Sequence, residues 1–449
     1  MRRYIDFFKT QKVTIEKFCN SLLNSHREKA LENFQHLGFP PNVEDHRCTN
    51  IDVATLLKEN SRLYLDLSGK KINPNTTLYY NVPQLISCIQ HFVINGYFLE
   101  HERKKNEDKQ KLPECFFSGS LNTFAKQYPD IFLKYYNRQS SFQGDGLSAF
   151  NTMFIQDGYV LYIPKNVIVK TPIQLTNILN SKVDLMVNRR NLIILEQNAQ
   201  AKLLICDHTT NENPTSAFVQ ITEIYLEERS VLDFYELEES SKKTIRLTHN
   251  FVCQKESSKL VIDTITLRNG ITQNNYTIDL KKENAETYIY GVAIADEKQK
   301  IDNCTLIYHN APKCYSNELF KYVLDEESIG AFVGKIVVSP NAYKTKAYQS
   351  NRSILGSNTC QMHSKPQLEI YTDDVKCSHG MSIGHLDETA LFYMRSRGIP
   401  DNEARFLLKT AFVSDILGGI SIKGLKKRLQ LLVEKRFKER LIKCQRCTH

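Results

Sequence analysis

Cys377 and His379 stand two positions apart in the segment TDDVKCSHG, residues 372–380. A thiolate and an imidazole both bind iron and other transition metals. Side chains at i and i+2 of a strand point to one face, so the two residues would supply half of a metal site. An iron site takes about four ligands, so a partner chain or bound sulfide would supply the others. The alternative is a core histidine satisfied by Asp373 or Asp374.

Two further groups of cysteine and histidine carry weaker signals. Cys360 lies three residues before His363 in CQMHSKP. Most free cysteines are buried small hydrophobes, and that reading is favoured over a metal ligand. The tail KCQRCTH holds Cys444, Cys447 and His449, which resembles half of a zinc or redox motif. Because no second half lies nearby, a frayed chain end with incidental cysteines is the better interpretation.

The elements that would position these groups are mainly strands. From about residue 150 the sequence breaks into short apolar or alternating runs for more than 200 residues, which predicts a sandwich, a barrel or a solenoid. Within this region an Asn-Gly hairpin signal occurs once, in LRNGI, whereas antiparallel meanders need it often. Similar corners recur and favour a solenoid of stacked coils. These corners are Asn198-Ala199, Asn284-Ala285, Asn310-Ala311 and Asn341-Ala342.

Helical patterns stand on both sides of the strands. Apolar residues between 15 and 34 share one face, which predicts a helix that ends at GFPP, residues 38–41. Residues 120–137 are a second candidate helix, and the charged stretch at 99–113 between the two is expected to be a loop. After residue 385, Asp387 is a plausible helix start, and Gly398 with Pro400 is a break before a second helix. The tail has an apolar stripe at steps of four within basic residues, which predicts an amphipathic helix. The stripe is Leu425, Leu429, Val433, Phe437 and Leu441.

Composition limits the class of protein. The chain has 449 residues, 41% of them hydrophobic, which is enough for a large core. The 12 cysteines are scattered, and neither a signal peptide nor a run of about 20 apolar residues is seen, so we expect a cytoplasmic protein without stable membrane insertion. Of the net charge of +9, an excess of 10 − 2 = 8 lies between 423 and 447. A nucleic-acid groove over the body is therefore not expected.

Motifs for nucleotide binding are missing from the sequence. It has no G-x-x-x-x-G-K-[ST] loop and no G-x-G-x-x-G, so any ATP hydrolysis would belong to a partner and no nucleotide is expected on this chain. Parallel β-helices also host polysaccharide lyases and hydrolases, where a glycosidase needs two carboxylates about 5 to 9 Å apart. Asp373 and Asp374 are adjacent and would point to opposite faces of a strand. A β-helical carbohydrate-active enzyme remains the alternative from another class.

The wider setting of the first motif is diagnostic. Residues 365–399, KPQLEIYTDDVKCSHGMSIGHLDETALFYMRSRGI, closely resemble the C-terminal signature of the SufD family, the scaffold subunits of Suf iron-sulfur cluster assembly. Residues 149–175 and 190–203 are similar to the family's entry into its core. GFPPNVEDHRCTNID, residues 38–52, is similar to its amino-terminal pattern, with His46 and Cys48 at positions that are aromatic in the family.

This resemblance implies a mainly β fold: a helical N-terminal domain (1–145), a right-handed parallel β-helix core (146–384) and a C-terminal helical domain with a basic amphipathic tail (385–449). It implies a non-catalytic scaffold that pairs with a SufB-like subunit and a SufC-like ATPase, supports iron acquisition, and shares a transient iron-sulfur cluster or iron with its partner. A SufB-like subunit or a homodimer is the alternative within the family, and a purely structural solenoid is a further one.

The resemblance also assigns residues. His379 would lie at the SufB interface and bind metal, with Cys377 as a structural thiol or a second ligand. The segment at Cys360 is similar to the one that carries the sulfur-accepting cysteine of SufB, so a minor role in holding iron or persulfide is the hypothesis for it. The SufC docking surface would lie in the C-terminal helices. Its predicted residues are Phe392, Tyr393, Arg395, Ser396, Arg397 and Gly398.

Overall fold

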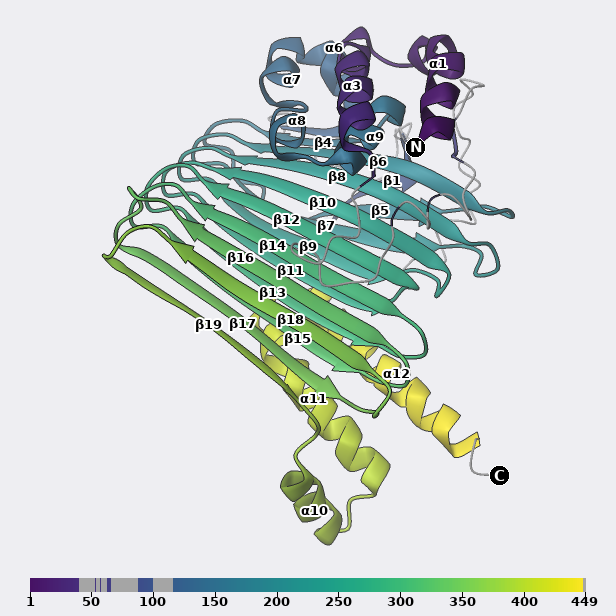
Figure 1. Ribbon diagram of the computed structural model, residues 1–449, viewed down its shortest axis with the longest axis vertical. Coiled ribbons are helices and arrows are strands. Elements are labelled where there is room, and N and C mark those ends of the chain that lie inside the picture. The colour runs from purple at the N-terminus through teal and green to yellow at the C-terminus, as the bar shows by residue number, and fades with distance from the viewer. Residues whose placement is uncertain (40–52, 54–56, 58–62, 66–87, 100–115, 447–449) are drawn as a thin grey trace.

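The core of the protein is a coil of parallel strands that forms two facing sheets (Figure 1). The computed structural model describes residues 1–39, 53, 57, 63–65, 88–99 and 116–446. From Tyr159 onward, successive strands alternate between the sheets, so each coil adds one strand to each. The short strands Tyr97–Phe98 and Phe117–Ser120 pair antiparallel with their neighbours. One sheet contains β1 (Ile89–Ile94), β2 (Tyr97–Phe98), β5 (Ile173–Leu179), β7 (Gln200–Thr209), β9 (Val231–Glu239), β11 (Lys259–Arg268), β13 (Glu286–Ala295), β15 (Tyr315–Leu324), β17 (Thr345–Leu355) and β19 (Val375–Gly384). The other contains β3 (Phe117–Ser120), β4 (Tyr159–Ile163), β6 (Leu185–Leu195), β8 (Ser216–Leu226), β10 (Thr244–Gln254), β12 (Ile271–Leu280), β14 (Lys300–His309), β16 (Ile329–Val338) and β18 (Gln361–Ile370). The predicted parallel β-helix is confirmed.

Helices lie at both ends of the chain. The N-terminal group is α1 (Arg2–Lys17), α2 (Ser21–Asn24), α3 (Arg27–Leu37), α6 (Leu121–Gln127), α7 (Pro129–Tyr135), α8 (Gln139–Gln143) and α9 (Gly146–Phe154). The C-terminal group is α10 (Glu388–Ser396), α11 (Asp401–Gly419) and α12 (Lys423–Arg446). The helix expected at 120–137 is divided because Pro129 begins a new helix, α7. Residues 40–52, which include His46 and Cys48, lie outside the described residues. Most of the charged stretch at 99–113 lies outside them as well.

The corners between coils use a left-handed residue followed by a small buried one. Asn198 and Asn284 have φ of 59° and precede Ala199 and Ala285, as the sequence pattern suggests. In the other two Asn-Ala pairs, the asparagine is not the left-handed residue. The left-handed residues there are Lys313 and Lys344, both with φ of 57°, and each lies three positions after the asparagine of its pair.

Each helical group covers the outer face of one sheet. The N-terminal helices pack on the sheet that contains β8 and β10, and the C-terminal helices pack on the other. In α12, Leu425, Leu429, Val433 and Phe437 are buried against that sheet, so the apolar stripe of the basic tail is covered by the protein itself. Among the described residues, no helix is long and apolar enough to cross a membrane.

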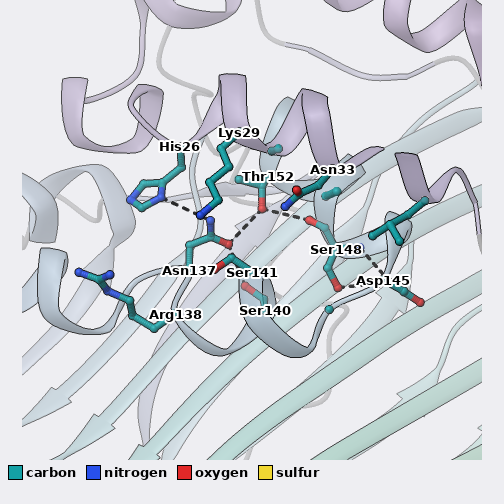
Figure 2. A pocket seen from close by; sticks show the side chains of 14 residues that line it. His26, Lys29, Asn33, Asn137, Arg138, Ser140, Ser141, Asp145, Ser148 and Thr152 are labelled. Atoms are coloured by element: carbon teal, nitrogen blue, oxygen red, sulfur yellow. Dashed lines mark hydrogen bonds between the residues drawn. The ribbon is translucent and has the colours of Figure 1, made fainter. Parts of the chain in front are cut away.

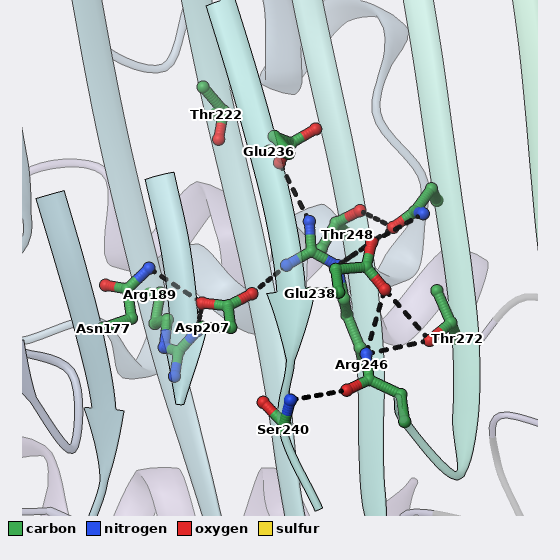
Figure 3. Close-up of polar contacts among 12 residues, drawn as sticks. Asn177, Arg189, Asp207, Thr222, Glu236, Glu238, Ser240, Arg246, Thr248 and Thr272 are labelled. Carbon is green, nitrogen blue, oxygen red and sulfur yellow. Dashed lines mark hydrogen bonds and ion pairs between the residues drawn. The ribbon is translucent and has the colours of Figure 1, made fainter. Parts of the chain in front are cut away.

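The inside of the solenoid is partly charged (Figure 3). Arg246 bonds Glu236 and Glu238 at 2.9 Å and also pairs with Asp207, which in turn bonds Arg189 at 2.6 Å. All five side chains are almost fully buried. Burial raises the pKa of both glutamates, whereas the two guanidinium groups outweigh burial and lower the pKa of Asp207. Charge balance therefore holds this part of the core together.

A buried histidine makes stability depend on pH. The His309 side chain lies inside the solenoid with Nε2 2.9 Å from the Ser316 hydroxyl, and burial lowers its pKa to about 3. The unfolded chain gains this proton near pH 6.5, so the stabilisation is complete above that pH and is lost as pH falls toward 3. We expect wild type to lose roughly 1.4 kcal/mol per pH unit below 6.5 relative to His309→Gln. Urea unfolding at pH 7 and 5 measures this, and equal losses in both proteins would contradict it.

Candidate functional site

The last coil of the solenoid holds the predicted cysteine-histidine pair. Strands β18 and β19 are the terminal strands of their sheets, and each is hydrogen-bonded to one neighbour. Cys377 pairs in register with Ala347, and His379 pairs with Gln349. Both partners are buried inside the solenoid. Cys377 and His379 therefore lie on one face of β19, the face that would point inward if another coil followed.

The two side chains differ in access. The His379 side chain is exposed, and no hydrogen bond to it is found within the described part of the chain. It is not a core histidine bound by Asp373 or Asp374. Cys377 is half-buried and packs on the apolar core, and burial raises the pKa of its thiol. The imidazole is thus the more accessible ligand of the pair.

Exposed apolar side chains lie in the same terminal coil as His379. Met381 and Ile383 follow it on the same face of β19 and are 57% and 40% exposed. Ile370 and Tyr371, at the end of β18 and just beyond it, are also exposed. Uncovered apolar groups beside two unpaired strand edges are typical of a protein interface.

Cys360 lies elsewhere in the same coil. It precedes β18, is 6% exposed and belongs to the apolar core, where its Sγ donates to the carbonyl groups of Ser357 at 3.2 Å and Leu324 at 3.6 Å. This is the geometry of an ordinary buried cysteine, and a role toward iron or persulfide stays a prediction. Among the described residues, no group of three or more His, Cys, Asp or Glu is arranged to hold a metal ion.

Two buried polar residues beneath His379 were missed by the sequence analysis. Glu318 and Gln349 are successive partners of His379 across β15, β17 and β19. The Gln349 Nε2 donates to Glu318 Oε2 at 2.6 Å, and burial raises the pKa of Glu318 to about 7. The sequence signal for this column is a polar residue within a strand that recurs at a regular interval: Gln349 follows Glu318 by 31 positions, and His379 follows Gln349 by 30.

The predicted docking residues lie on and just after α10. Asp387 caps this helix by accepting from the backbone N–H groups of Thr389 and Ala390, as its position predicts. Leu391 anchors it in a small core, while Phe392 and Tyr393 are 71% and 59% exposed. The paired aromatic rings are therefore free to meet another molecule.

Other predicted docking residues shape the end of α10. The Arg397 guanidinium lies 5.2 Å from the centre of the Tyr393 ring, and Arg395 pairs with Asp401 at 3.6 Å. Ser396 donates to the Tyr393 carbonyl at 2.7 Å. Gly398, with φ of 84°, provides the turn into α11.

A polar cavity of about 440 Å³ lies among the N-terminal helices (Figure 2). His26 and Lys29 line it from the α3 side, and Asn137, Ser148 and Thr152 line it from the opposite side. Figure 1 places these helices at the opposite end of the solenoid from β19. The cavity therefore contains none of the predicted site residues. The C-terminal residues Cys447 and His449 lie outside the described part of the chain.

Comparisons with known proteins agree with this architecture. Residues 177–412 match the family described as SUF system FeS cluster assembly, SufBD core domain, and residues 1–175 match the SufBD protein N-terminal region. A SufBD family iron-sulfur cluster assembly protein of Synechocystis is 29% identical over 76% of each chain. The SufD protein of Bacillus subtilis is 25% identical over 70% of this chain and 72% of its own length. The SufD protein of Escherichia coli is 31% identical over 42% of this chain and 45% of its own length. The chain belongs to the SufBD family of iron-sulfur cluster assembly proteins.

Proposed function

We propose that the chain is a SufD-like scaffold subunit whose open solenoid end pairs with a SufB-like subunit. The observation that carries this proposal is the position of His379: an exposed imidazole on the terminal strand, on the same face as Cys377 and in a coil that also has uncovered apolar side chains. A partner that covers the apolar groups would bring its own ligands to the imidazole. Iron or a nascent cluster is then the cargo of a site shared by two chains.

The shared site has a physical advantage for a scaffold. A cluster held by few ligands from two chains is released when the chains move apart, whereas a closed four-cysteine site retains it. The chain carries no nucleotide-binding motif, so the ATP hydrolysis that drives such a movement belongs to a SufC-like partner. The scaffold itself is non-catalytic in this proposal.

The alternative within the family is a SufB-like or homodimeric subunit. A SufB-like role needs a thiol that accepts sulfur, and Cys360 is the residue at the corresponding position. Its Sγ is enclosed in the core and directed at two backbone carbonyl groups. This burial favours the SufD-like role.

Affinity purification of this chain from its own cells, under anaerobic conditions and with mass spectrometry of the bound proteins, tests the proposal. We expect a SufB-like subunit and a P-loop ATPase. Recovery of the chain alone, or of two copies of it, would contradict the pairing. Activity of the isolated chain on acidic polysaccharides would support the carbohydrate-active alternative.

The ATPase is proposed to dock on α10. Replacing both Phe392 and Tyr393 with alanine removes two exposed aromatic anchors, residues of the kind that carry most of the energy of an interface. We expect recovery of the ATPase to fall at least about tenfold while the SufB-like subunit is retained. Leu431→Ala, which removes another exposed apolar side chain from α12, is the matched control. Equal recovery of the ATPase from the double variant and the control would contradict this docking site.

A further inference from the structure

A column of three side chains runs to the open end of the solenoid. Glu318, Gln349 and His379 occupy the same register position on β15, β17 and β19. Adjacent strands lie about 4.8 Å apart, so each side chain lies beside the next one. Glu318 and Gln349 are 0% and 3% exposed, whereas His379 is exposed at the end of the column.

The Gln349 amide is held in one orientation. Its Nε2 donates to Glu318 Oε2 at 2.6 Å, which fixes the nitrogen toward the inner coil. Gly334 lies opposite, and a Cβ atom there would lie 2.0 Å from the same nitrogen, so the absence of a side chain leaves room for the amide. The Gln349 Oε1 is buried and accepts no hydrogen bond from any described residue.

We propose that Gln349 is a positioning residue for His379: the exposed imidazole, which makes no hydrogen bond to the described residues in the free chain, turns toward the column when the shared site forms, and the Gln349 carbonyl oxygen then accepts a hydrogen bond from one imidazole N–H. A buried oxygen without a donor is unfavourable, and the imidazole is the next group in the column. Histidines that bind metals donate their other ring N–H to a carbonyl or carboxylate group, which sets the tautomer and the ring orientation. The bond leaves the second ring nitrogen of His379 free to bind iron. Glu318 acts by holding the amide.

The neighbouring polar residue on β17 does not have this arrangement. Asn351 is also fully buried and pairs in register with Met381, but its Oδ1 already accepts from the Ser353 hydroxyl at 3.3 Å. It offers no free acceptor to the terminal strand. Asn351→Leu is therefore a matched control for Gln349→Leu.

The inference rests on the proposed function of His379, and the experiment separates the two. The whole chain, with its histidines labelled with ¹⁵N, is purified in its native complex, and Fe²⁺ affinity and the solid-state ¹⁵N spectrum are measured for each variant. The His379 signal is identified by its loss in His379→Ala. We expect Gln349→Leu to weaken Fe²⁺ binding about tenfold and to shift the His379 signal toward the other tautomer.

Variants of Glu318 test how the amide is held. Glu318→Gln keeps an acceptor for Gln349 Nε2 and is expected to keep both the affinity and the tautomer, while Glu318→Leu is expected to lose them. Asn351→Leu is expected to keep both. If His379→Ala lowers Fe²⁺ affinity but Gln349→Leu leaves affinity and tautomer unchanged, the positioning role is wrong. If His379→Ala itself changes nothing, the proposed function of His379 fails as well.

Discussion

Replacing Arg246 with alanine is expected to lower the free energy of unfolding by about 3 to 5 kcal/mol. Its guanidinium is fully buried and pairs with Asp207, Glu236 and Glu238. Without it, Asp207 keeps its ion pair with Arg189, whereas Glu236 and Glu238 lose the guanidinium that pairs with both of them. A buried charge that loses its partner costs far more than the pair contributed.

Urea denaturation at neutral pH measures this loss. Lys298→Ala is the control, because it also removes an ion pair, with Glu327, but both side chains are largely exposed. Exposed pairs contribute little to stability. If Arg246→Ala unfolds at the same urea concentration as Lys298→Ala, the buried network is not a source of stability.

The effect of Arg246→Ala should also depend on pH. Burial already raises the pKa of Glu236 and Glu238, and removal of the guanidinium raises both further. A glutamate whose pKa is higher in the folded protein than in the unfolded chain destabilises the fold at a pH above its unfolded-state pKa, about 4.3. Below that pH the glutamate is protonated in both states and has no such effect. The difference between wild type and variant should therefore shrink as the pH falls from 7 toward 5. A difference that grows over this range would contradict this electrostatic explanation.

Local signals in the sequence predicted most strands of the solenoid and the C-terminal helices. Short apolar runs with polar corners predicted the strands of the solenoid because each run fits one side of a coil. Asp387 predicted the start of α10 because a side-chain oxygen satisfies the first free N–H groups of a helix. The apolar stripe that begins at Leu425 predicted α12, and the protein's own sheet covers that stripe.

The repeat of the solenoid was harder to see. Its corners need a left-handed residue, which Asn adopts readily, but Arg229, Ser257, Lys313 and Lys344 take that conformation here. The backbone N–H group of each of these residues donates to a backbone carbonyl group of the next coil, which holds the residue in this conformation. Because no single residue type marks the corner, the period of about 30 residues that register shows was not visible in the sequence.

The candidate site was predicted only in part. The spacing of Cys377 and His379 places them on one face, since strand geometry is local. The exposure of His379 depends on the solenoid ending at β19, and the role of Gln349 depends on register with a strand 30 residues earlier. A shift of β19 by one residue in that register would place the His379 side chain on the face opposite to Gln349.

His379→Ala is expected to reduce the yield of iron-sulfur cluster in the assembled complex by at least about tenfold. In the proposed shared site the exposed imidazole on the terminal strand is the metal ligand, and the half-buried Cys377 cannot replace it while its thiol stays protonated. The solenoid should keep its stability, because the His379 side chain is exposed at the end of the terminal strand and is not part of the packed core. Both partners should therefore still be recovered with the variant.

His363→Ala provides the matched control. His363 is an exposed histidine on β18, in the same terminal coil, but it is adjacent to the inward-packed Met362 and so points to the outer face of the solenoid. Cluster yield is measured by the visible absorption of anaerobically reconstituted complex, alongside partner recovery and the thermal midpoint. A normal yield in His379→Ala would mean that the partner supplies every ligand. An equal loss in both variants would mean that the terminal coil contributes its surface rather than this imidazole.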